Sequence, residues 1–154
     1  MAFPTVYKYV SETGNVAFID EVIPFANKDE GTVYEHLKRA IDFSMNHLGK
    51  HGMPAGLYAD WNDCLRLGAD GESTFVALQF YYAMTILKEF AAYKKDDEYI
   101  AYLDESRKNS ERSFRSFAGT RTDLSVDLQG MDRLSESVMI LRQICGSTHR
   151  AGLL

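Results

Sequence analysis

Four consecutive residues, Asp60, Trp61, Asn62 and Asp63, place the only tryptophan of the chain between carboxylates. An aromatic ring can pack on the apolar face of a sugar, and a carboxylic acid can protonate the departing oxygen of a glycosidic bond. The same residue types more commonly form turns, cap helices or fill a core. The spacing alone therefore leaves a sugar-processing site and a structural turn both open.

These residues lie in a long segment with several glycines, which runs from Gly49 to about Glu72. A loop of such length is usually either functional or disordered. Disorder is not expected, because the segment carries too much apolar surface to stay solvated, on Met53, Leu57, Tyr58, Trp61, Leu65 and Leu67.

Helical patterns flank this loop on both sides. Thr32 and Glu35 have the spacing of a capping box, and the amphipathic helix that they open is predicted to run to Leu48. The segment Ser73–Tyr93 is apolar on every side of a helix and must therefore be covered on every side. A third helix is predicted from Asp97 to about residue 108.

Shorter helical turns are predicted at residues 5–12, stopped by Gly14, and at 17–23, ended by Pro24. No strand pattern competes with these assignments, so the predicted class is all-α. An amphipathic helix, a long loop and then an enclosed helix suggest two helical layers, with an inner ring of helices inside an outer one. A chain of 154 residues supplies only part of such a ring.

Bulk composition excludes several classes of protein. The net charge of −5 and the lack of a basic stripe in the first hundred residues argue against nucleic acid as a partner. Gln79, Lys88 and Glu89 interrupt the longest apolar stretch, so no membrane span is expected. Cys64 and Cys145 give no disulfide framework, which fits a reducing cytoplasm, and no His/Cys cluster suggests a metal site.

The loop sequence resembles a known family. The string H-G-M-P-A-G-L-Y-A-D-W-N-D-C-L, followed by G-E-S, is similar to the catalytic loop of the cellobiose phosphorylase family, glycoside hydrolase family 94. The upstream strings Y-K-Y-V-S-E-T-G, V-I-P-F and E-H-L-K-R-A-I-D-F also resemble that family, in the same order. The resemblance covers about residues 5–108 and implies a fragment of an (α/α)6 barrel, in agreement with the two helical layers.

The resemblance also implies an activity. It is the inverting phosphorolysis of cellobiose, a β-1,4-linked glucose disaccharide, to glucose 1-phosphate and glucose. Inorganic phosphate is then the co-substrate, no further cofactor is expected, and the intact enzyme is expected to be a homodimer.

Site residues follow from the same resemblance. It makes Asp63 the general acid and places Trp61 against the sugar at the cleavage site, with Asp60 as a partner for sugar hydroxyls. Glu72 and Ser73 also match the family, which leaves a direct substrate role open for both. Capping of a helix by Ser73 and complementing of its dipole by Glu72 explain them as well.

A single acid is sufficient for this chemistry. An inverting hydrolase needs a second carboxylate to activate water, whereas phosphate is already an anionic nucleophile. Asp63 must then stay protonated at neutral pH, which burial or a neighbouring negative charge favours.

The composition of the chain changes near residue 106. All nine tyrosines lie at or before Tyr102, and Lys108 is the only lysine beyond residue 106. In another reading frame, residues 117–128 and 139–152 can spell strings that resemble the next segments of the family. We therefore divide the chain into a partial catalytic barrel segment at 1–109 and an aberrant, frameshifted tail at 110–154, and we expect the truncated chain alone to be inactive.

Two alternatives remain open. One is another substrate for the same barrel, either longer cellodextrins or chitobiose. The other is a non-catalytic helical module whose loop binds carbohydrate or a protein partner.

Overall fold

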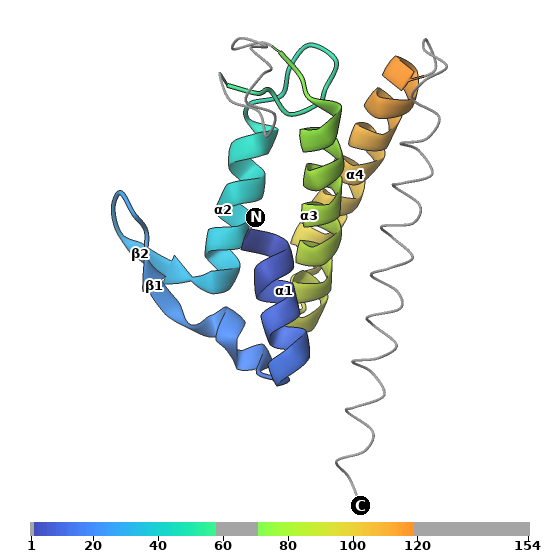
Figure 1. Ribbon diagram of the computed structural model, residues 1–154. Coiled ribbons are helices and arrows are strands. Elements are labelled where there is room, and N and C mark those ends of the chain that lie inside the picture. Colours follow the sequence, from blue (N-terminus) through green and yellow to red (C-terminus); the bar gives the residue numbers. More distant parts are fainter. Residues whose placement is uncertain (1, 58–70, 119–154) are drawn as a thin grey trace, which may run out of the picture.

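The computed structural model describes residues 2–57 and 71–118. Its elements, in chain order, are helix α1 (Ala2–Thr13), the 3₁₀ helix η1 (Val16–Asp20), strands β1 (Val22–Pro24) and β2 (Glu30–Thr32), and helices α2 (Val33–Met45), α3 (Thr74–Lys94) and α4 (Asp97–Ala118). This part of the chain is mostly helical, which confirms the all-α class (Figure 1).

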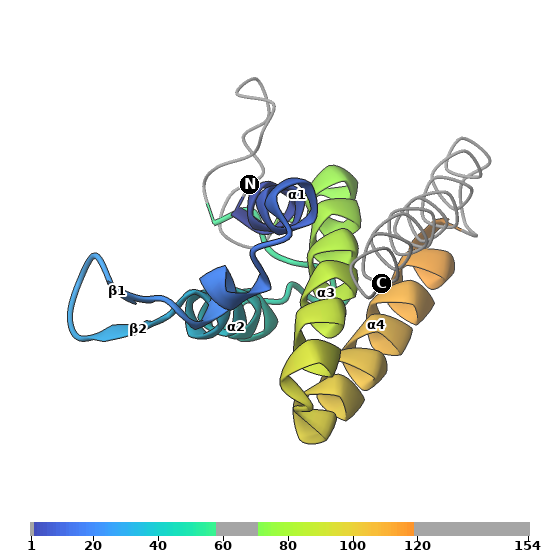
Figure 2. The ribbon, with the colours of Figure 1, turned by 90° about the horizontal axis from the view of Figure 1, so that it is seen from below.

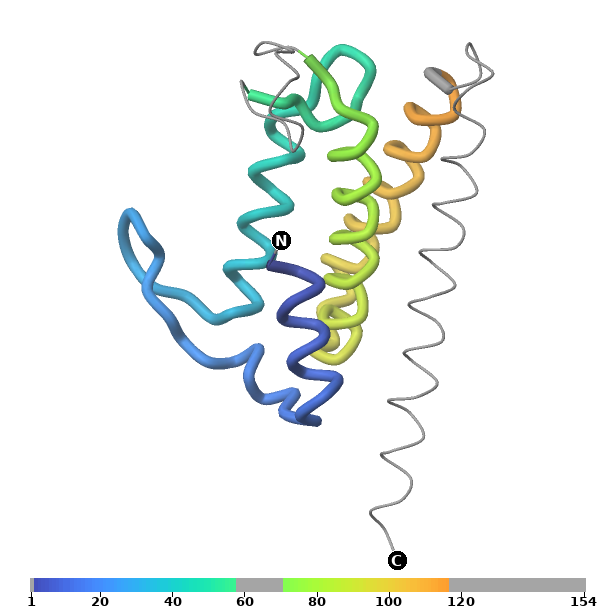
Figure 3. The backbone as a smooth tube through the Cα atoms, viewed as in Figure 1, coloured from blue at the N-terminus to red at the C-terminus, as the bar shows by residue number. Residues whose placement is uncertain are grey.

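The helices alternate in direction along the chain. Helices α1 and α3 run in one direction, away from the loop, and α2 and α4 run in the opposite direction (Figures 1 and 3). Helix α3 lies between α4 on one side and α1 and α2 on the other (Figure 2). Alternating helices in two layers are the architecture of an (α/α)6 barrel, of which this segment is a fragment.

Helix α3 supplies most of the core. Its residues Met84, Ile86 and Leu87 are fully buried, and they meet Ile41 of α2 and Leu103 of α4 in one hydrophobic cluster. The predicted enclosure of α3 is therefore achieved where α1, α2 and α4 pack against it. Near the two ends of the helix, Phe75 and Tyr93 remain 43% and 56% exposed.

Several helix ends follow from their predicted signals. The Gly14 amide donates to the Val10 carbonyl at 2.9 Å, and the positive φ of +69° at Gly14 ends α1 as expected. Thr32 and Glu35 form the predicted capping box, with the Glu35 amide 3.1 Å from Thr32 Oγ1. Ser73 caps α3 by accepting the Val76 amide at 3.4 Å.

Two predicted helix ends were wrong. Helix α2 ends at Met45 rather than at Leu48, because Leu48 instead forms an antiparallel bridge with Pro54. Helix α4 continues to Ala118, past the predicted end near residue 108.

A small antiparallel ribbon was not predicted. Strand β1 pairs with β2 through Val22 and Thr32 and through Ile23 and Gly31, in a segment that was expected to be helical up to Ile23. Strands of three residues are too short to show a period-two pattern. Among the described helices, none is long and apolar enough to span a membrane.

Candidate active site

The loop that contains Asp60, Trp61 and Asp63 joins α2 to α3, and its described residues lie at the end of the segment where α3 begins (Figure 3). The predicted general acid Asp63 and the predicted sugar-binding residues Trp61 and Asp60 fall within residues 58–70, outside the described residues. Their roles stay predictions. What the structure describes is how the chain enters and leaves that stretch.

The entry and exit of the loop lie side by side. The Gly56 amide donates to the Gly71 carbonyl at 2.7 Å, and Ala55 forms an antiparallel bridge with Glu72. The residues around Asp60, Trp61 and Asp63 are therefore joined to the rest of the chain through two adjacent, hydrogen-bonded points.

The first part of the loop folds back on itself before that stretch begins. The Gly49 amide donates to the Met53 carbonyl at 2.8 Å, and the Ala55 amide donates to the His47 carbonyl at 2.9 Å. At the tip of this turn Gly52 has φ of +79°, a conformation that favours glycine. A Cβ at Gly52 would also lie 2.6 Å from Ser113 Oγ of α4.

The Glu72 side chain is buried beside this turn and binds its backbone. Its side chain is only 5% exposed, and Oε1 accepts the amides of His51 at 3.0 Å and of Met53 at 3.1 Å. Oε2 pairs with Nδ1 of the His51 ring. The interpretation of Glu72 as a complement to the dipole of α3 was therefore incomplete, because the carboxylate binds the loop backbone instead.

Gly49 makes room for this carboxylate. A Cβ at Gly49 would lie 2.4 Å from Cγ of Glu72 and 2.5 Å from its Cδ, closer than atoms can approach. Any larger residue would displace the Glu72 side chain. The sequence analysis placed the start of the loop at Gly49, but the spacing of residues could not predict its contact with Glu72, 23 positions along the chain.

A second, smaller cluster anchors the loop to two helices. Met53 is 2% exposed and packs with Ala77 of α3 and Phe114 of α4, which is 3% exposed. The contribution of Phe114 was missed. A helical spacing from Leu103 through Ser106 and Ser110 to Phe114 could have predicted that the helix continues. The apolar stripe was not evident because serines occupy two of those positions.

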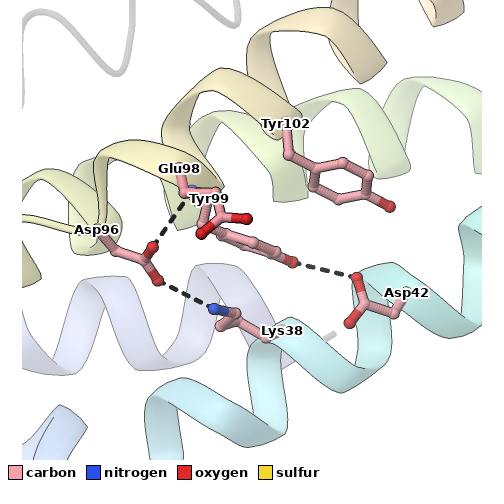
Figure 4. Close-up of a pocket in the computed structure, with 6 residues that line it drawn as sticks. All are labelled: Lys38, Asp42, Asp96, Glu98, Tyr99 and Tyr102. Atoms are coloured by element: carbon pink, nitrogen blue, oxygen red, sulfur yellow. Dashed lines mark hydrogen bonds and ion pairs between the residues drawn. The ribbon is translucent and has the colours of Figure 1, made fainter.

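The described residues also line a polar pocket of about 480 Å³ between α2 and the start of α4 (Figure 4). Lys38 Nζ bonds Asp96 Oδ2 at 2.9 Å and lies 4.0 Å from the centre of the Tyr99 ring, and the Tyr99 hydroxyl donates to Asp42 at 3.4 Å. The bond from Lys38 lowers the pKa of Asp96, and burial raises the pKa of Tyr99.

This network joins α2 to the start of α4. Asp96 lies in the turn that follows α3, about 30 Å along that helix from the loop by its rise per residue. The pocket is therefore separate from the candidate active site. Within the described ranges, no group of three or more His, Cys, Asp or Glu residues could hold a metal ion.

Comparisons with known proteins match the described helices and the loop between α2 and α3 to one family. The profile described as "Glycosyl hydrolase 94 superfamily, catalytic domain" matches residues 2–118. This match runs through the whole of α4, past residue 109, where the sequence had suggested the end of the barrel segment.

Curated relatives share this stretch. An N,N'-diacetylchitobiose phosphorylase of Vibrio furnissii is 46% identical over 93 residues, which is 60% of this chain and 12% of the relative. A second one, of Vibrio proteolyticus, is 45% identical over 95 residues, 62% of this chain and 12% of the relative. A solabiose phosphorylase of Paenibacillus borealis is 37% identical over 101 residues, 64% of this chain and 13% of the relative. The chain thus spans about an eighth of the length of these relatives.

Proposed function

The chain belongs to the glycosyl hydrolase 94 superfamily, in its catalytic domain, and from that premise we propose that the full-length protein is an inverting disaccharide phosphorylase. The observation that carries the proposal is the family match over residues 2–118, which includes the entire loop between α2 and α3. The structure supports the proposal by tying the two ends of that loop together at the N-terminal end of α3.

Asp63 is the proposed general acid. It protonates the glycosidic oxygen while phosphate attacks the anomeric carbon from the opposite face, so the bond to the leaving sugar breaks as the bond to phosphate forms. The products are a sugar 1-phosphate and a free sugar. Because the attacking group is already anionic, no second carboxylate is needed.

Trp61 and Asp60 are the proposed binding residues. The indole of Trp61 packs on the apolar face of the sugar at the cleavage site, and Asp60 accepts hydrogen bonds from sugar hydroxyls. The remaining barrel, which contributes the phosphate site, lies beyond this segment in the proposed enzyme.

Cellobiose is the first proposed substrate, from the motifs around Asp63. N,N'-diacetylchitobiose is the second, and the two Vibrio relatives named for that activity favour it at 46% and 45% identity. Both sugars have the same β-1,4 linkage and differ by the acetamido group at C2. Residues outside this segment that face C2 decide between them. The proposed enzyme acts in the cytoplasm as a homodimer.

The test uses the frame-restored protein, which follows this chain to the end of the family match and then continues in the alternative reading frame. Each disaccharide is incubated with and without inorganic phosphate, and sugar 1-phosphate is measured. Phosphate-dependent release from either sugar supports the phosphorylase and identifies its substrate. Cleavage of both without phosphate would indicate a hydrolase, and binding without cleavage would indicate the non-catalytic module.

A further inference from the structure

We propose that Glu72 is a positioning residue of this active site, which fixes the loop backbone from which Asp63 acts. The proposal rests on the proposed function, since it concerns how the acid of that reaction is held. In this role Glu72 neither contacts the sugar nor transfers a proton. His51 is its partner.

The Glu72 carboxylate binds groups of the preceding turn. A carboxylate offers about four acceptor positions, and Glu72 uses three of them, on two backbone amides and one imidazole. An ionised carboxylate only accepts, so the His51 tautomer that fits this pair is the one with its proton on Nδ1. A buried carboxylate with these partners is costly to remove, because the loop amides would lose their acceptor.

Glu72 lies where the chain leaves the loop. It directly follows Gly71, whose carbonyl accepts the Gly56 amide, and its own backbone pairs with Ala55. The same residue therefore holds the exit of the loop through its backbone and the preceding turn through its side chain. Both attachments lie next to the points where the chain enters and leaves residues 58–70.

The position of the loop backbone affects catalysis. A general acid must lie within hydrogen-bond reach of the oxygen that it protonates. A shift of about 1 Å in a catalytic group can cost on the order of a hundredfold in rate. Loss of the Glu72 attachments should therefore lower kcat of the frame-restored protein while the protein stays folded.

Two substitutions at position 72 separate positioning from chemistry. Glu72→Gln keeps the oxygen that accepts both amides, and its amide nitrogen can donate to Nδ1 of the other His51 tautomer. Glu72→Ala removes every one of these contacts. If Glu72 positions the loop, we expect kcat to fall about a hundredfold in Glu72→Ala and to stay within about threefold of wild type in Glu72→Gln.

Gly49→Ala displaces the carboxylate without removing it. Its Cβ would collide with Cγ of Glu72, so this variant should lower kcat in the same direction as Glu72→Ala. Glu105→Ala removes an exposed carboxylate from α4 and is the matched control, with kcat unchanged. Melting temperatures of all four variants show whether each protein is folded at the assay temperature.

Hydrogen exchange gives a readout that does not depend on activity. The amides of His51 and Met53 should be protected in wild type and in Glu72→Gln, and should exchange faster in Glu72→Ala. Equal loss of kcat in Glu72→Gln and Glu72→Ala would overturn the proposal in favour of direct chemistry or sugar binding by Glu72. Unchanged kcat in a folded Glu72→Ala, or unchanged exchange of these two amides, would overturn it as well. A wild-type protein without phosphorolysis would instead contradict the proposed function, while the exchange measurement would still decide whether Glu72 holds the loop.

Discussion

Met53 of the loop and Phe114 of α4 belong to one buried hydrophobic cluster, which also includes Ala77 of α3. The contact joins the turn held by Glu72 to the last part of α4. Residues beyond 109, where the sequence analysis placed the end of the barrel segment, thus help to support the candidate active site. The family match through residue 118 covers the same residues.

Phe114→Ala should destabilise the frame-restored protein by about 3 kcal/mol, because it leaves a cavity beside Met53 and Ala77. Denaturant unfolding measures the change. Ser116→Ala, at an exposed position of the same helix, is the control and should be nearly neutral. Equal stability of both variants would show that Phe114 does not belong to this cluster.

Asp96→Asn should remove a pH-dependent part of the stability. The pKa of Asp96 is lowered below its ordinary value of 3.8, first by the bond from Lys38 and also by the Tyr34 hydroxyl and the Tyr99 amide. A lowered pKa contributes stability that is present above the ordinary value and is lost as the pH falls through the folded value.

The difference in melting temperature between wild type and Asp96→Asn is therefore expected at neutral pH and should shrink below about pH 4. Glu105→Gln on α4 is exposed and serves as the control. A difference that grows with acidification would contradict the role given to the ion pair with Lys38.

Much of the helical frame could be predicted because its signals are local. The capping residues bond to partners three or four positions away, as their types and spacing indicate. They are Gly14, Ser73 and the pair Thr32 and Glu35. The helix class and the barrel layers followed from apolar patterns in the same way.

What could not be predicted depends on contacts between distant segments. Nothing in the spacing of Glu72 indicates that its carboxylate turns back to the amides of His51 and Met53. The end of α4 was placed too early because Ser106 and Ser110 stand where an apolar stripe would have continued to Phe114. Short strands such as β1 and β2 have too few residues for a period to be visible.

Trp61→Phe in the frame-restored protein should weaken disaccharide binding by up to about tenfold, the scale of one aromatic contact. Its melting temperature should stay close to that of wild type, because the indole is proposed to face the sugar. The Michaelis constant for the disaccharide and the melting curve are measured together. A large loss of stability with unchanged kinetics would show that Trp61 belongs to the core.

The 154-residue chain on its own should release no sugar 1-phosphate. We expect this because the phosphate-binding residues of the family are expected downstream of this loop, outside the segment. Incubation of the purified chain with cellobiose or N,N'-diacetylchitobiose and phosphate tests this. Release above that of a protein-free control would contradict it.

The role of Asp63 is the centre of this account, and one comparison tests it directly. Phosphate-dependent release of sugar 1-phosphate is measured for the frame-restored protein and for its Asp63→Asn variant, which keeps the shape of the side chain and loses the acidic proton. The account predicts that kcat falls at least about a hundredfold, the usual scale for a lost general acid, with the melting temperature unchanged. Near-normal turnover by a folded Asp63→Asn protein would contradict it.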